Sequence, residues 1–383
     1  MLRAFFFIVF SWLAVEVLLR FYICRLYRSK TGRDTSFLIY PEEWLIRTTK
    51  ICRYQPHPYI IFTKRPDVRG LASSGAFASN NFGFEGTRDI QQKKPSGTFR
   101  IICLGGSNTE ENHDREPDRT YPDFLEQELN KTFGGAVEVL NAGNSGYTTV
   151  ESLNNFALRL LDFEPDMIIY YEAINDVYFS GLLDGFRPDY AHARRNTPDH
   201  PGFWDKLPAI PWSFCYSWGR TRLLRVFAMT KGLIQWVNYS PLRPASRFEP
   251  GAVAAYKRNL KSLCAVALAH GVAPVLVPFS YNPALKKGLS SRVLGTYKLE
   301  SCQEWLVPYL DGNNAALPGI AQELPGVKYL EVAPLEERFF LSGDDCHCTT
   351  EGLRELAARI ARPLAPVIRE KMKGPGHETE KKC

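Results

Sequence analysis

The sequence predicts a three-layer α/β/α fold, in which a mostly parallel sheet lies between two layers of helices. Three observations support this fold. Apolar strand-like runs alternate with amphipathic helical segments, the strand runs are apolar throughout, and polar motifs follow several of them. An N-terminal transmembrane helix and an inserted cap region complete the prediction. With 383 residues, 45% of them hydrophobic, the chain can bury a large core in one main domain with additions.

The main domain is assigned to residues 99–370, where predicted strands and helices alternate. Because ligands in such sheets bind beyond the carboxyl ends of the strands, the loops after the strands are the expected place for a site. Strands are expected at 100–104, 137–140, 166–171, 272–278 and 327–332. Helices are expected at 121–133, 153–163 and 253–270, and a final helix buries the face that carries Leu353, Leu356, Ile360 and Leu364.

The first predicted helix is a nearly continuous apolar segment at residues 4–24. Its length is enough to cross the roughly 30 Å hydrocarbon layer of a membrane. No small-residue cleavage site follows, which favours a retained anchor over residues 1–28 and disfavours a removed signal peptide. A helix packed on the protein is the alternative. Glu16 and Arg20 lie four residues apart and can pair within the helix. The lysines and arginines that follow the segment outnumber the single Arg3 before it, and a literal positive-inside count places the main domain in the cytoplasm.

Three further segments flank or interrupt the main domain. Residues 29–98 form an extension whose second half is polar and rich in glycine and serine, as expected of a connector that wraps the domain. Residues 177–250 interrupt the alternation after the third strand and are expected to form a cap over the site. A satellite core that packs its own loops is the alternative for this insertion. Its tryptophans are Trp204, Trp212, Trp218 and Trp236. Residues 371–383 are a charged tail.

Charge and cysteine content argue against nucleic-acid binding, a disulfide framework and a zinc site. The formal net charge of +6 comes partly from the flank of the apolar segment and the tail, without the dense basic stripe of a nucleic-acid-binding protein. The nine cysteines are scattered and odd in number, so they indicate no disulfide framework. Cys346-His347-Cys348 lacks the second, spaced pair that zinc sites use, so no metal is expected there.

Four short polar motifs together supply the chemistry of acyl transfer. A serine hydroxyl such as that of Ser107 needs an imidazole to take its proton and a carboxylate to orient that imidazole. Asp344 and His347 provide this pair within one turn. A developing oxyanion needs fixed N–H donors, which Gly146 and the Asn175 amide can supply. The motifs are GGS at 105–107, NSG at 144–146, IND at 174–176 and DDCH at 344–347.

Each motif also has a structural explanation when it stands alone. GGS alone is usually a turn. Ser107 does not fit the GxSxG elbow of α/β-hydrolases, because position 109 is threonine, and the segment lacks the lysine of a P-loop. Asn175 and Asp176 could cap the segment that follows them, and residues of the last motif could cap the final helix; the candidates there are Asp344, Asp345 and Thr350. Asp345 and Asp176 are also alternative partners for the histidine. His113 is a rival base close to the serine in sequence.

In this order the motifs resemble the SGNH (GDSL-type) hydrolase superfamily, above all its bacterial membrane-anchored members. The resemblance covers roughly residues 55–370 and includes a motif before the first strand. The matching segments are NFGFEG at 81–86, GGSNT at 105–109, NAGNSGYT at 141–148 and DDCHCTTEG at 344–352. Two residues depart from the family pattern. Gly106 replaces the aspartate of the commoner GDS motif, and Ala173 stands where a glycine is usual, which is expected to narrow the pocket or tilt Asn175.

The resemblance implies a flavodoxin-like sheet and a serine hydrolase that cleaves acyl esters through an acyl-enzyme. Ser107 would attack, His347 would act as base and then acid, and Asp344 would orient His347, as the D-x-x-H spacing of the family selects. The oxyanion would be held by Ser107 N–H, Gly146 N–H and Asn175. No metal or organic cofactor is implied. The substrate would be a small-molecule or glycan-linked acyl ester.

The resemblance also places the catalytic domain outside the cytoplasm, in the periplasm, against the positive-inside count. Two other functions stay open. An O-acyltransferase would deliver the same acyl group to a polysaccharide or glycan hydroxyl, and a decayed binding protein would have lost catalysis.

Overall fold

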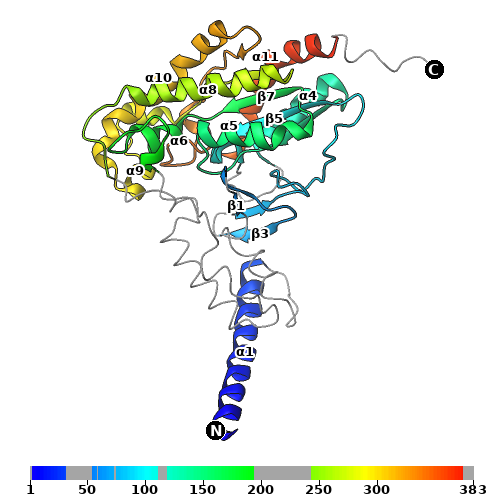
Figure 1. Ribbon diagram of the computed structural model, residues 1–383, viewed down its shortest axis with the longest axis vertical. Coiled ribbons are helices and arrows are strands. Elements are labelled where there is room, and N and C mark those ends of the chain that lie inside the picture. Colours follow the sequence, from blue (N-terminus) through cyan, green and yellow to red (C-terminus); the bar gives the residue numbers. More distant parts are fainter. Residues whose placement is uncertain are drawn as a thin grey trace, which may run out of the picture.

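The computed structural model describes residues 2–31, 54–57, 59–72, 75–110, 119–193 and 243–373 (Figure 1). Most of the predicted cap, with its four tryptophans, lies outside the described residues, as do His113 and residues 374–383 of the tail. The described ends of the insertion lie side by side, since Ala245 N–H donates to Leu182 O over 2.9 Å.

The domain is built on a five-stranded parallel sheet with the order β6-β5-β7-β8-β9. All side chains of β5 and β7, the second and third strands of this order, are buried. This topology confirms the predicted α/β fold with a flavodoxin-like sheet. The strands are β5 (Phe99–Gly105), β6 (Val137–Asn141), β7 (Met167–Tyr171), β8 (Ala273–Leu276) and β9 (Lys328–Tyr329).

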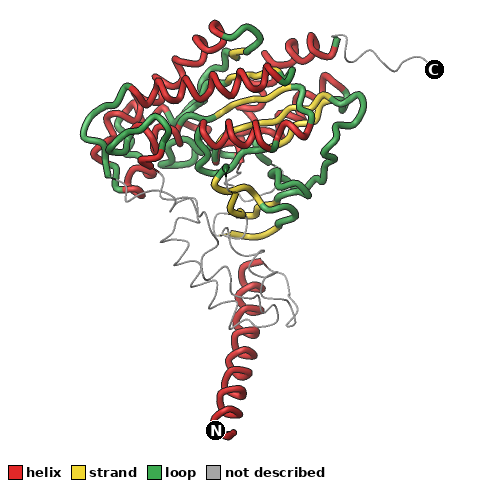
Figure 2. Tube along the Cα trace, in the orientation of Figure 1, coloured by secondary structure: helices red, strands yellow, loops and turns green. Residues whose placement is uncertain are grey.

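Helices cover both faces of the sheet (Figures 1 and 2). α4 (Tyr121–Phe133) packs against α11 (Thr350–Met372), while α8 (Gly251–Ala269) packs against both α5 (Thr149–Leu158) and α10 (Gln303–Glu323). The shorter helical segments are α3 (Ser107–Glu110), η2 (Leu160–Phe163), α6 (Ile174–Asp176), η3 (Val177–Gly181), η4 (Ala191–Ala193), η7 (Pro283–Lys287), α9 (Arg292–Tyr297), η8 (Glu300–Cys302) and η9 (Glu337–Phe339).

Two of the longer helices differ from the sequence prediction. α5 begins four residues earlier than expected, because Thr148 and Glu151 form a capping box, in which Thr148 N–H donates to Glu151 Oε2 over 2.8 Å. α10 was not predicted. It contains Pro308 and Pro318, and proline inside a helical segment normally indicates its end.

The connector contains two antiparallel hairpins that the sequence analysis did not predict. The first joins β1 (Tyr54–His57) to β2 (Ile61–Lys64), and the second joins β3 (Arg69–Ala72) to β4 (Gly75–Ala78). The NFGFEG motif at 81–86 then approaches strand β2 of the first hairpin. Gly83 has a φ of 80°, and a Cβ there would lie 2.7 Å from Lys64 O. Only glycine therefore fits this close approach.

The N-terminal helix α1 (Leu2–Thr31) extends away from the domain (Figure 1). Its large apolar side chains are mostly exposed, and Glu16 and Arg20 pair as predicted, with Oε1 and Nε 3.2 Å apart. By length and composition the stretch Phe5–Tyr22 suits a membrane crossing, a property that signal sequences share.

Candidate active site

Ser107 begins α3, at the carboxyl end of β5, where the chain turns sharply through two glycines. A Cβ on Gly106 would lie 2.3 Å from Asn175 Nδ2 and 2.3 Å from Glu172 Oε2. The site therefore has no room for the aspartate of the commoner motif, because a glutamate that arrives from β7 already fills that space. This explains the first departure from the family pattern.

The structure brings Ser107, His347 and Asp344 into one hydrogen-bonded chain, although Ser107 and His347 are 240 residues apart. Ser107 Oγ lies 2.9 Å from His347 Nε2, and His347 Nδ1 lies 2.9 Å from Asp344 Oδ1. The side chains of His347 and Asp344 are 17% and 12% exposed, so the pair is largely shielded but still reachable by a small substrate.

Asp344 is held as a carboxylate by its surroundings. Burial alone would raise the pKa of this carboxyl group, but the hydrogen bond and charge of His347 outweigh burial. The backbone N–H groups of Cys346 and His347 also donate to Asp344 Oδ1, over 3.0 and 2.9 Å. The pKa of Asp344 is consequently well below its usual range. An ionised Asp344 can fix the orientation of His347.

The two competing carboxylates contact other groups. Asp345 Oδ2 accepts a hydrogen bond from Tyr178 OH over 2.6 Å, and Asp176 Oδ1 accepts one from Tyr190 OH over 2.7 Å. Burial raises the pKa of Asp345, and it raises the pKa of Asp176 to about 7. Both aspartates tie surrounding loops together.

The capping alternatives fail for both motifs. α11 is capped by Thr349, whose Oγ1 accepts from Gly352 N–H over 3.1 Å, and not by Asp344, Asp345 or Thr350. Asp176 occupies the N-cap position of η3 and Ala173 that of α6, and neither position has a side-chain cap.

Asn175 and the loop of Gly146 lie beside the nucleophile. The Asn175 side chain donates from Nδ2 to Tyr147 O over 3.0 Å, and the same nitrogen borders Gly106. Gly146 has a φ of 76°, which glycine adopts without cost. The neighbouring Asn144 N–H donates to Gly105 O over 3.1 Å, which fixes this loop to the end of β5.

Glu172 is a residue of the site that sequence analysis missed. Its Oε2 accepts a hydrogen bond from Gly106 N–H over 3.1 Å, and its Oε1 accepts one from Asn175 N–H over 2.9 Å. One carboxyl group therefore connects the turn before Ser107 to the backbone of Asn175. Burial raises the pKa of Glu172 to about 8 against these donors. An acidic residue directly after the apolar strand β7 was the available signal.

Within the described residues, one group of side chains can converge on a metal ion, and it overlaps the serine–histidine–aspartate chain. The ligand atoms of Asp344, Cys346 and His347 lie within 4.8 Å of one another. Burial raises the pKa of the Cys346 thiol well above its usual value, which disfavours the thiolate that metals require. Cys348 is outside this group. A metal here would also compete with Asp344 for His347.

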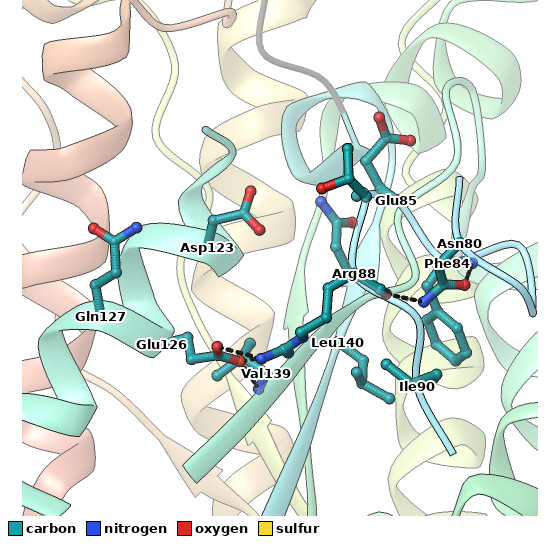
Figure 3. Close-up of a pocket in the computed structure, with 13 residues that line it drawn as sticks. Asn80, Phe84, Glu85, Arg88, Ile90, Asp123, Glu126, Gln127, Val139 and Leu140 are labelled. Carbon is teal, nitrogen blue, oxygen red and sulfur yellow. Dashed lines mark hydrogen bonds and ion pairs between the residues drawn. The ribbon is translucent and has the colours of Figure 1, made fainter. Parts of the chain in front are cut away.

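A hollow of about 240 Å³ lies between the connector and α4, and Ser107 and His347 do not line it (Figure 3). Arg88 and Glu126 form an ion pair across it, with Nη1 and Oε1 2.7 Å apart. The hollow is therefore separate from the serine and its partners.

A family model, the GDSL-like lipase/acylhydrolase family, matches residues 103–354. A search of the curated proteins finds no match. Similar solved structures include a lipase/acylhydrolase from Enterococcus faecalis, 15% identical with a TM-score of 0.41 over 70% of this chain and 97% of that chain.

Two others are a GDSL-like lipase from Bacteroides thetaiotaomicron (13% identity, TM-score 0.37, 70% of this chain and 88% of that chain) and the psychrotrophic esterase EstA from Pseudoalteromonas sp. (10% identity, TM-score 0.39, 70% and 98%). The family match spans well over half of the sequence. The chain therefore belongs to the GDSL-like lipase/acylhydrolase family and is an ester hydrolase.

Proposed function

We propose that this ester hydrolase cleaves acyl esters through an acyl-enzyme on Ser107. The observation that carries the proposal is the pair of 2.9 Å contacts from Ser107 Oγ through the His347 ring to Asp344. A serine activated in this way is a nucleophile, and a histidine held by a carboxylate is its base.

In the first step Ser107 Oγ attacks the carbonyl carbon and passes its proton to His347 Nε2. The oxyanion forms opposite Ser107 N–H, Gly146 N–H and Asn175 Nδ2. When it collapses, the bond from carbon to the alcohol oxygen breaks, and His347 returns the proton to the departing alcohol. Water then repeats the sequence, losing its proton to His347, and the acyl group leaves as a carboxylic acid while Ser107 regains its proton.

Labelling with a fluorophosphonate probe tests the nucleophile. We expect the wild-type protein to be labelled and to hydrolyse p-nitrophenyl esters, and Ser107→Ala to lose both properties while keeping its melting temperature. Ser152→Ala is a matched control, because that buried serine lies on α5 and its hydroxyl has no hydrogen-bond partner within the described residues. Labelling that persists in Ser107→Ala would refute the assignment.

The same acyl-enzyme would serve an O-acyltransferase, in which a glycan hydroxyl takes the place of water. The fate of the acyl group separates the two reactions. With a p-nitrophenyl ester and a polysaccharide acceptor, a hydrolase releases free acid at the same rate with or without the acceptor. A transferase accumulates the glycan ester.

The proposal includes a retained membrane anchor at α1 and a catalytic domain outside the cytoplasm. The exposed apolar side chains of α1 support the anchor. The resemblance to membrane-anchored family members that work outside the cytoplasm supports the orientation. Protease digestion of spheroplasts, in which the cytoplasmic membrane is intact, tests the orientation. A catalytic domain that is cleaved only after the spheroplasts are lysed would reverse it.

A further inference from the structure

Lys64, at the end of the connector hairpin, is buried beside the catalytic loops, and its side chain is 1% exposed. Its ammonium group lies 3.3 Å from Glu110 Oε1 and 3.1 Å from Glu85 Oε2, and it donates to Gly143 O over 2.5 Å. Glu110 is fully buried and closes α3, three residues after Ser107. A charge in such a place is stable only when it is paired and hydrogen-bonded.

Glu110 in turn holds the loop that carries Gly146. Its Oε2 accepts hydrogen bonds from Ser145 N–H over 2.7 Å and from the Ser145 hydroxyl. Its Oε1 accepts from Tyr54 OH over 2.6 Å, so β1 of the hairpin contacts the same carboxylate. Lys64 thus acts on the loop twice, through the Gly143 carbonyl and through Glu110.

The hairpin also touches the other side of Gly146. Tyr147 is 1% exposed, packs against Ile60 and Phe62, and donates a hydrogen bond from its hydroxyl to Phe62 O. The carbonyl of the same Tyr147 accepts from the Asn175 amide. Contacts from β1 and β2 therefore reach both neighbours of Gly146 in the sequence.

We propose that Lys64 is a positioning residue of the active site, which fixes the oxyanion loop through Glu110 and Gly143. The inference rests on the proposed role of Gly146 N–H as an oxyanion donor. In this proposal the connector hairpin, which lies outside the four motifs of the main domain, contributes to catalysis. Lys64 itself touches no reacting atom; its effect is on the place of the Gly146 amide when charge develops on the substrate.

The test compares Lys64→Met with Lys94→Met in the full-length, detergent-solubilised protein. Lys94 is also a connector lysine in an ion pair, with Nζ 2.5 Å from Asp166 Oδ1. Asp166 lies at the amino end of β7, however, whereas Ser107 follows the carboxyl end of β5. We expect Lys64→Met to lower kcat for p-nitrophenyl esters by about 10- to 100-fold per folded molecule with KM changed less than about threefold, because one displaced oxyanion donor affects mainly the transition state. Lys94→Met should keep kcat within about twofold.

Rescue provides a second measurement that a purely structural role would not produce. In Lys64→Met the Glu110 carboxylate lacks its cation, whereas Lys64→Met/Glu110→Gln keeps a neutral acceptor for Ser145 N–H. The double variant should therefore turn over at least about threefold faster than Lys64→Met. Glu110→Gln alone leaves Lys64 paired with Glu85, so it should fold even if Lys64→Met does not, and its kcat should fall at least about threefold.

Two results would overturn the inference. One is a Lys64→Met kcat equal to that of Lys94→Met, and the other is a wild-type kcat in Glu110→Gln. In either case a wild-type protein that hydrolyses the ester and takes up the fluorophosphonate keeps the proposed function intact. A wild-type protein that does neither removes the proposed function itself.

Discussion

Glu110 and Glu172 approach the nucleophile turn from opposite sides, and both are almost fully buried, but they differ in how their charge is balanced. Glu110 faces the loop after β6 and is paired with Lys64, 3.3 Å away. Glu172 follows β7 and accepts from two backbone N–H groups, and within the described chain it forms no ion pair. Burial raises its pKa to about 8.

The difference shows that, at this site, the cation that balances a buried carboxylate comes from outside the parallel sheet. The lysine that balances Glu110 comes from a hairpin outside the sheet, and it reaches only the β6 side of Ser107. Glu110 is therefore a paired carboxylate that anchors a loop, whereas Glu172 has no ion pair within the described chain and burial raises its pKa. The expected effects of substitution follow from what each carboxylate touches.

The largest effect is expected where a carboxylate touches the base itself. Asp344→Asn should lower kcat by about 10⁴-fold with little change in fold, because an amide no longer selects the right tautomer of His347. Steady-state kinetics with a p-nitrophenyl ester measures the loss. Asp345→Asn is the control, since its partners are Tyr178 and Ser291, and it should cost stability more than turnover. Unchanged turnover in Asp344→Asn would return Asp345 and Asp176 to consideration.

A smaller effect is expected at Asn175. Its backbone N–H donates to Glu172, and its side-chain amide is a proposed donor to the oxyanion. Asn175→Ala should lower kcat by roughly 10²- to 10³-fold with KM little changed, because its amide would act mainly in the transition state. Melting temperature and kcat should be measured on the same preparation. A destabilised variant with normal turnover would remove Asn175 from the oxyanion site and leave two backbone donors.

Glu172→Gln tests the buried carboxyl group that has no ion pair within the described chain. We expect kcat to fall about tenfold, because glutamine accepts from one of the two N–H groups and turns a donor toward the other. The pH dependence of stability should change as well. The pKa of Glu172 is raised from its ordinary 4.5 to about 8 in the folded protein, so the unfolded chain loses this proton at a lower pH than the folded protein does. Glu172 therefore destabilises the fold increasingly as the pH rises from about 4.5 to 8.

Denaturant titrations of wild type and Glu172→Gln over this pH range measure that contribution. The difference between their free energies of unfolding should change by up to about 1.4 kcal/mol per pH unit, in the direction that favours the variant at higher pH. A difference that is constant from pH 5 to pH 8 would show that Glu172 is ionised throughout, like a paired carboxylate.

The smallest effect is expected from removal of residues 1–28. This truncation deletes most of α1 but keeps the connector hairpin, so kcat and KM should stay within about twofold and the product should be soluble without detergent. Ultracentrifugation and ester hydrolysis check both properties. A truncated protein that fails to fold would show that α1 is part of the core.

The fold could be predicted from the sequence where periodicity was strong. The apolar runs before the GGS and IND motifs became β5 and β7, and the helix at 121–133 has the expected bounds. α10 was missed because its two prolines suppress the helical pattern. The connector hairpins were missed because their strands are four residues long and lie among glycine and proline.

The site divides in the same way. Residues proposed to touch the substrate lie in short motifs, three of which follow strands, and their types alone indicated the chemistry. Glu172, Glu110 and Lys64 support those residues from inside the protein, and a buried carboxylate or lysine in a sequence looks like any surface charge. Only the fold shows that a lysine 43 residues before Ser107 lies against its helix.

The central claim is that an acyl group passes through Ser107. Acid quench of the enzyme during turnover of a slow ester, followed by peptide mass spectrometry, tests it most directly. The account predicts the acyl mass on the peptide that contains Ser107, and its loss in Ser107→Ala. An acyl group on Cys346 or another residue, or steady hydrolysis by Ser107→Ala at the wild-type rate, would contradict it.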